Sequence, residues 1–201
     1  QTAQREGHVT WLVLLGINYA VKSVAFTLAL WYVNALNAAV YIPLIPVFAI
    51  IMCRMLGWET LNMMQIGGTV LAVSGALLVT VVRYSSSDTS TSATAILVGN
   101  GLLLLWDSTA AAAIVMQRPL LRHHTPITLS AVTMTIAAVV LAVLVPWCGG
   151  TSSSDWVLST TAQVAIVYCG FYNLVAAWGD AWAVTQIPAS VVAMWLVLEP
   201  I

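Results

Sequence analysis

The chain has 201 residues, of which 61% are hydrophobic and 6% are charged, and its formal net charge is −1. Soluble domains carry about 25% charged residues, so a soluble fold of this length cannot hide so much apolar surface. The balanced charge gives no sign of a nucleic-acid partner, and the three cysteines lack metal-ligand spacing. The composition therefore predicts an integral membrane protein without a metal or cofactor.

Seven apolar segments qualify, or nearly qualify, as membrane-spanning helices. Lipid offers the backbone no hydrogen-bond partners, so a crossing segment must be a continuous helix of about 20 residues. The sequence predicts an all-α, multi-pass helical bundle with segments at 9–32, 35–53, 61–82, 93–116, 127–147, 160–184 and 188–201. Because the first residues are polar and the last apolar segment is unfinished, we expect a fragment of a longer protein without a signal peptide.

Small residues and prolines indicate how these helices pack and bend. Helices in lipid associate through small residues, and Gly68, Ala72 and Ala76 recur at four-residue spacing in segment 61–82. This spacing, with Gly75 beside it, predicts a close-contact face. The two prolines of segment 35–53 remove backbone hydrogen bonds and predict a bend or a local gap.

One stretch of the sequence recurs. Residues 29–46 can be laid without a gap over residues 183–200, and in the same register Gly16 falls on Gly170. Apolar helices resemble each other by composition alone, but a glycine and a proline thirty residues apart in both copies are harder to explain that way. We therefore predict two related halves, each with a helix, a short break and a second helix.

The arginines predict how the chain is oriented in the membrane. Positive residues are enriched in cytoplasmic links. One side of the predicted spans receives Arg5, Arg54, Arg118 and Arg122, whereas the other receives Arg83. Residues 1–8, 54–60 and 117–126 are thus predicted to be cytoplasmic. The two copies of the repeat then cross the membrane in opposite directions, as in many secondary transporters.

The same residues resemble a known family. Ala29, Leu30, Tyr32, Ala35 and Pro46 follow a run typical of EamA-type members of the drug/metabolite transporter superfamily. The second half carries similar runs at 187–190 and 198–200, and the stretches 57–79 and 93–126 are also family-like. The resemblance covers nearly the whole chain.

The resemblance implies a bundle of ten helices built from two inverted five-helix repeats, of which this chain would hold the third to ninth. Residues 1–82 would then be the C-terminal part of the first repeat, 83–92 a linker loop, and 93–201 a second repeat truncated at its end. The implied function is secondary transport of small polar metabolites by alternating access, and not catalysis. EamA-like proteins export amino acids and drugs, while related branches exchange nucleotide sugars or sugar phosphates.

Charged residues inside the spans are the first candidates for a transport site. A charge in the bilayer core costs about 2.5–3.5 kcal/mol on insertion scales, so it generally faces a cavity or a partner. Lys22 and Asp107 lie near the middles of their segments. If those helices meet, the two would form either a structural ion pair or a contact for substrate or a proton. Asp180 lies nearer the cytoplasmic end of its segment, and Glu199 either breaks a helix or lines a cavity.

Uncharged polar and aromatic side chains complete the candidate set. In the register of the repeat, Asn18 and Tyr19 fall on Tyr172 and Asn173, which predicts polar groups at equivalent depth in both halves. Trp106 could stack on a substrate, although tryptophans in such chains more often pack or anchor helices in lipid.

Three other classes of protein compete with a transporter. A non-transporting membrane partner or scaffold is also compatible with the composition. A seven-helix receptor or retinal protein leaves the internal repeat unexplained, and segment 188–201 has no lysine for a Schiff base. A membrane-embedded hydrolase lacks both H-E-x-x-H and G-x-S-x-G. The expected partners are a small-molecule substrate and the bilayer; the sequence specifies neither the membrane nor an oligomeric state.

Overall fold

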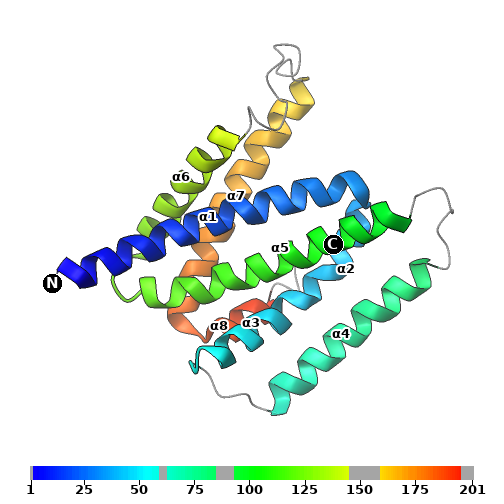
Figure 1. The fold of residues 1–201 in the computed structure, drawn as a ribbon, viewed down its shortest axis with the longest axis horizontal. Helices are drawn as coiled ribbons and strands as arrows, with labels where there is room; N and C mark the ends of the chain where they lie inside the picture. The colour runs from blue at the N-terminus through cyan, green and yellow to red at the C-terminus, as the bar shows by residue number, and fades with distance from the viewer. Residues whose placement is uncertain (1, 59–62, 85–92, 145–158, 196–201) are drawn as a thin grey trace. The chain divides into compact units, whose positions relative to one another are not determined.

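The computed structural model describes residues 2–58, 63–84, 93–144 and 159–195, and every element of regular secondary structure in these ranges is helical (Figure 1). The elements in chain order are α1 (Thr2–Tyr32), α2 (Ala35–Tyr41), the 3₁₀ helix η1 (Ile42–Leu44), α3 (Ile45–Met55), α4 (Met63–Tyr84), α5 (Ala93–Leu120), α6 (Pro126–Leu144), α7 (Thr160–Gln186) and α8 (Ala189–Trp195). The predicted all-α class is confirmed.

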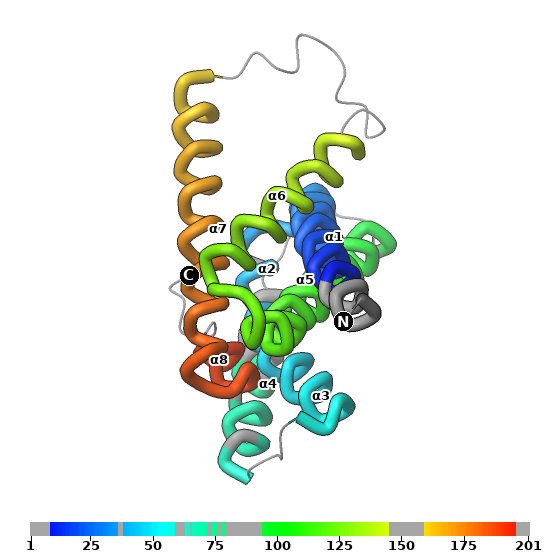
Figure 2. Tube along the Cα trace, turned by 90° about the vertical axis from the view of Figure 1, so that its left-hand side faces the viewer, coloured from blue at the N-terminus to red at the C-terminus, as the bar shows by residue number. Residues whose placement is uncertain are grey.

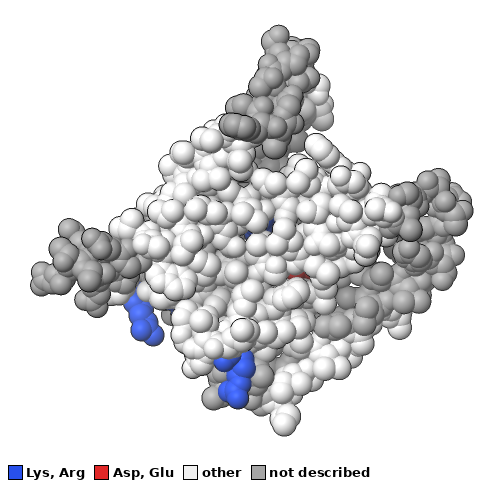
Figure 3. All heavy atoms as spheres, viewed as in Figure 1, with Lys and Arg blue, Asp and Glu red and all other residues white. Residues whose placement is uncertain are grey.

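Several helices are long and apolar enough to cross a membrane. Among the described residues, five segments meet both conditions: Val9–Tyr32, Ala38–Met55, Thr94–Leu120, Pro126–Leu144 and Thr160–Gln186. The face of the molecule seen in Figure 3 is almost free of charged side chains where it is described. The protein is a multi-pass integral membrane protein.

The second predicted segment is interrupted at its prolines. α2 ends at Tyr41, a 3₁₀ turn follows over Ile42–Leu44, and α3 begins directly afterwards. Pro43 and Pro46 each occupy the first turn of a new helical piece, where a missing backbone N–H is not needed by the helix. The predicted interruption is therefore present, as a change of helix type.

The two copies of the repeat break at equivalent places. α1 ends at Tyr32 and α7 ends at Gln186, while α2 begins at Ala35 and α8 begins at Ala189. Both boundaries thus differ by the same 154 positions that align the sequences. Both copies therefore contain a helix, a two-residue break and a second helix, as the repeat predicts. The predicted boundaries of the two halves stay a prediction.

The helices form two packing units, one of residues 1–20 and 116–186 and the other of residues 21–115 and 187–201. In the first unit, α6 packs along α7 near the start of α6, and the two separate toward its end (Figure 2). The hydroxyl Oγ of Ser130 donates to the carbonyl oxygen of Ala177 at 3.1 Å. This bond links the buried faces of the two helices.

The first unit also contains a close approach between α1 and α6. A Cβ atom placed on Gly16 would lie 2.5 Å from Cγ2 and 2.6 Å from Cβ of Ile136. No other residue type fits there without a shift, so Gly16 lets the two helices touch. A Cβ on Gly170, the equivalent position of the repeat, would meet no atom within 4 Å.

In the second unit, α8 lies against α3, and the last turns of α1 pack on α5. The apolar cluster between α1, α2 and α5 consists of Ala29, Val33, Ala38 and Leu103. Gly99 of α5 approaches the end of α1, since its Cβ would lie 2.6 Å from Cγ1 of Val33.

The close-contact face predicted on α4 is not found at its glycines. A Cβ on Gly68 or Gly75 would meet no atom within 4 Å, and the side chains of Ala72 and Ala76 lie outside the described residues. At the two glycines the spacing is therefore not matched by a neighbouring helix, and a small residue allows close packing only where another helix faces it.

Candidate functional site

Asp107 is a carboxyl group enclosed within a predicted membrane span. Its side chain is 0% exposed, and neither Oδ1 nor Oδ2 has a hydrogen-bond partner among the described residues. It lies on the buried face of α5, one turn after Leu103 of the apolar cluster and one turn before the buried Ala111. Of the polar side chains nearby, Tyr41 of α2 is close enough to interact with it electrostatically.

The helix register shows why Asp107 does not pair with Lys22. Gly99 meets Val33, and the ring of Trp106 meets that of Phe26, so α5 runs antiparallel to the last turns of α1. In this register Asp107 is level with Ala25, while Lys22 lies three residues further back, about 4.5 Å along the axis. The pair considered from the sequence is therefore not formed here as a hydrogen-bonded contact. Lys22 is half-buried and has an interaction of its own.

Trp106 is held by packing within the protein. Its ring centroid lies 4.8 Å from that of Phe26, with the planes inclined at 39°. Both rings are partly buried and pack against the apolar cluster. This geometry gives an aromatic pair of the tilted kind, which stabilises helix contacts. The contact with Phe26 is not evidence that Trp106 stacks on a substrate.

A second polar cluster lies in the other packing unit. The amide nitrogen Nε2 of Gln117 donates to the hydroxyl oxygen of Tyr19 at 2.8 Å, and both side chains are buried. The half-buried carboxyl of Asp180 on α7 acts electrostatically on the same hydroxyl. The structure thus brings together two site residues predicted from the sequence, Tyr19 and Asp180, and one that was not predicted, Gln117.

Gln117 was missed because the sequence placed it in a polar link. The predicted segment ended at residue 116, whereas α5 continues through Leu120. Helical spacing carried the signal: Leu103, Asp107, Ala110, Ile114 and Gln117 follow one another at intervals of three and four residues, and all five are buried.

The remaining candidates are not assembled into either cluster. Asn18 is half-buried on α1. Asn173 is exposed on α7, and its Nδ2 donates to the carbonyl oxygen of Cys169 one turn earlier, at 2.8 Å. Its repeat neighbour Tyr172 is 46% exposed. Glu199 lies outside the described residues. Tyr19 and Asn173 thus differ in burial, while their equivalent depth in the two halves stays a prediction.

Metal ligands do not gather in the described part of the chain, where no group of three or more His, Cys, Asp or Glu side chains could hold an ion. In the described parts of the spans, the candidate polar groups include the buried carboxyl of Asp107 and the cluster of Tyr19, Gln117 and Asp180.

Comparison with known families gives a match in the first part of the chain. The model of the EamA-like transporter family matches residues 1–81, which include α1 to α3 and most of α4. The match covers less than half of the 201-residue chain. No curated protein and no solved structure shows a significant match to the chain. The matched segment is similar to a family of membrane transporters, which is consistent with an EamA-type member of the drug/metabolite transporter superfamily.

The Tyr19–Gln117 bond allows a first prediction. We expect Tyr19→Phe and Gln117→Leu to be coupled by about 0.6 kcal/mol in the free energy of unfolding, because interhelical hydrogen bonds in membrane proteins average that value. A double-mutant cycle of unfolding in detergent measures the coupling. Thr135→Ala is the control, since that exposed hydroxyl bonds only to the carbonyl of Ala131 on its own helix. Additive effects of the two substitutions would mean that the bond does not form.

Proposed function

We propose that this EamA-like protein is a secondary transporter, which moves small polar metabolites across a membrane by alternating access. The observation that carries the proposal is Asp107, a fully buried carboxyl without a hydrogen-bond partner in a membrane span. Such a group destabilises a purely structural bundle, and ionisable residues inside membranes generally mark substrate or ion pathways. The family match over residues 1–81 supports the same conclusion.

The Tyr19, Gln117 and Asp180 cluster supports a polar substrate. Hydroxyl, amide and carboxyl groups provide donors and acceptors for a metabolite that carries several polar groups of its own. The buried Oε1 of Gln117 has no hydrogen-bond partner in the described residues, so one acceptor of the cluster is still available. We propose that Tyr19 and Asp180 contact the substrate during its passage.

Uptake into proteoliposomes tests the function. The purified protein would be reconstituted and offered a panel of radiolabelled amino acids, nucleotide sugars and sugar phosphates, with protein-free vesicles as the control. We expect saturable uptake of at least one class, because a transporter has a finite number of sites. If no compound of the panel enters above the control, the alternative of a non-transporting membrane partner is favoured.

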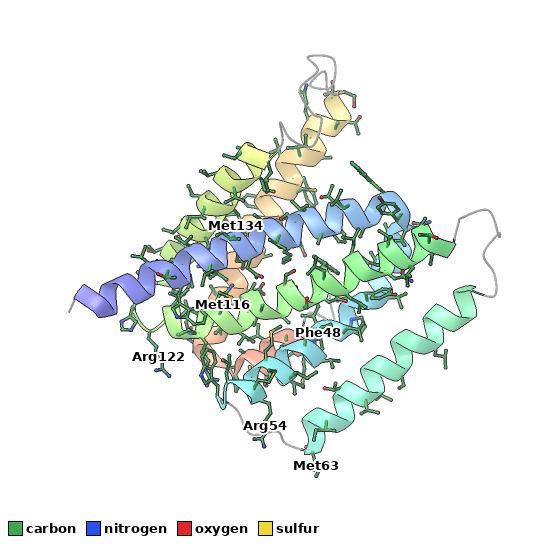
Figure 4. The ribbon with its side chains drawn as sticks, in the orientation of Figure 1. Phe48, Arg54, Met63, Met116, Arg122 and Met134 are labelled. Atoms are coloured by element: carbon green, nitrogen blue, oxygen red, sulfur yellow. The ribbon has the colours of Figure 1, made fainter. Side chains whose placement is uncertain are left out.

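The orientation of the chain is part of the proposal. We place residues 1–8 and 54–60 in the cytoplasm, together with the part of the predicted link 117–126 that follows the end of α5 at Leu120, because the arginines gather on this side. Arg54 at the end of α3 and Arg122 after α5 both extend away from the helices (Figure 4).

Cysteine labelling checks this orientation. In a cysteine-free background, His123→Cys should react with a membrane-impermeant maleimide only after the cells are opened. Ser159→Cys, on the far side of α6, should react in intact cells. The reverse pattern would invert the proposed topology.

A further inference from the structure

We propose that Asp107 binds and releases a proton during transport, so that substrate movement is coupled to a proton gradient. The inference rests on the proposed transport function and specifies what drives it. It starts from the environment of one carboxyl group in the described conformation.

An ionised carboxylate at this position receives no compensating hydrogen bond from the described residues. Moving a carboxylate out of water costs several kcal/mol unless opposite charges or hydrogen-bond donors surround it. Neither oxygen of Asp107 accepts a hydrogen bond from a described residue. The neutral, protonated acid avoids most of this cost, so the enclosed carboxyl holds a proton.

The ionisable groups of the surrounding helices do not change this conclusion. The other charged side chains described in this unit are Lys22, one turn away on α1 with an interaction of its own, and Arg54, exposed at the end of α3. From α2, Tyr41 presents a phenol, which is neutral at ordinary pH. The described helix α8 carries no ionisable side chain. Cys53 of α3 carries a buried thiol.

Alternating access links the protonation of Asp107 to the movement of substrate. When a conformational change brings the carboxyl into contact with water on one side, its O–H bond breaks, the proton passes to water, and a hydrated carboxylate remains. The enclosed state can form again only after the carboxylate has taken up a proton. Because enclosure requires the proton, each passage through this state is linked to protonation. If the carboxyl is open to water on one side before it is enclosed and on the other side afterwards, the proton is carried across the membrane.

A proton fits this position better than a larger cation. It needs no space beyond the carboxyl group itself, which is 0% exposed. Leu103, Ala110 and Ala111 occupy the neighbouring turns of the same buried face. An organic cation would have to displace this packing.

Infrared spectroscopy tests the protonated state without any substrate. We expect the carbonyl stretch of a protonated carboxyl in wild-type protein in lipid at neutral pH, and its loss in Asp107→Asn. Ser108→Ala is the matched control, because its hydroxyl bonds only to the carbonyl of Leu105. A spectrum that is the same in wild type and Asp107→Asn overturns the proposal. So does a band that 10 mM tetraethylammonium chloride abolishes, which would assign the site to organic cations.

Transport driven by a pH gradient tests the coupling. With one proton per substrate, a difference of one pH unit supports about tenfold accumulation. We expect this accumulation in wild type and Ser108→Ala, and its loss in Asp107→Asn, which should still equilibrate substrate between the two sides. Equilibration shows that the variant is folded. Uptake that does not respond to the gradient overturns coupling while leaving the transport function intact, whereas a complete lack of uptake in wild type contradicts the transport function itself.

Discussion

Replacing Gly16 by alanine is expected to destabilise the protein by about 1–3 kcal/mol, the usual cost of forcing extra atoms into a packed contact. The new Cβ would lie 2.6 Å from Cβ of Ile136, an atom fixed to the backbone of α6. A small rotation of the isoleucine side chain cannot relieve that overlap, so α1 and α6 must move apart. The midpoint of unfolding of the purified protein in detergent measures the effect.

Gly170→Ala is the matched control for this prediction. The repeat places Gly170 at the position equivalent to Gly16, but a Cβ there meets no atom within 4 Å. We expect Gly170→Ala to leave stability unchanged or to raise it slightly, since alanine favours helix over glycine. Equal losses in the two variants would contradict the asymmetry and would indicate that both glycines are contact sites.

The different surroundings of these two glycines show what a repeat in sequence can predict. Related segments fold into the same local pattern, and here both copies break after Tyr32 or Gln186 and resume at Ala35 or Ala189. Local structure depends on residues near in sequence, such as the proline that precedes Ala189. Contacts depend on which other helix faces each copy, and this is not encoded in the copies themselves.

Helix positions were predictable from hydropathy, but one helix end was not. The polar residues Gln117 and Arg118, followed by Pro119, predicted that the link between the fourth and fifth segments begins at residue 117. The structure keeps the helix through Leu120, with Gln117 buried. A proline disrupts the bonds of the turn before it, so the helix ends soon after Pro119. The polarity of Gln117 suggested a solvated link, whereas its side chain donates a hydrogen bond to the hydroxyl of Tyr19.

The sequence predicted several residues of the candidate site, but it did not predict which of them are in contact. A charge in an apolar segment stands out in any sequence, and Asp107 was found for that reason. Whether it meets Lys22 depends on the register between α1 and α5, which the packing of Gly99 against Val33 fixes. A shift of about one helical turn separates a hydrogen-bonded ion pair from an isolated carboxyl. No local pattern contains that information.

Gly99 should accordingly be sensitive to any side chain. We expect Gly99→Ala to lower the free energy of unfolding by about 1–3 kcal/mol, because its Cβ would lie 2.6 Å from Cγ1 of Val33 and 2.9 Å from Cβ of Tyr32. The overlap pushes α5 away from the last turns of α1, where the apolar cluster is built. Unfolding in detergent, followed by tryptophan fluorescence, measures the change because Trp106 packs on that cluster.

Gly101→Ala provides the control on the same helix, two residues away. A Cβ on Gly101 meets no atom within 4 Å, so the substitution adds helix propensity without overlap and should stabilise by up to about 1 kcal/mol. The two variants have identical composition, and only position distinguishes them. If Gly99→Ala is as stable as Gly101→Ala, then α1 and α5 do not approach as described. The register that isolates Asp107 from Lys22 would then have to be abandoned, and an ion pair between them would again be the simpler account.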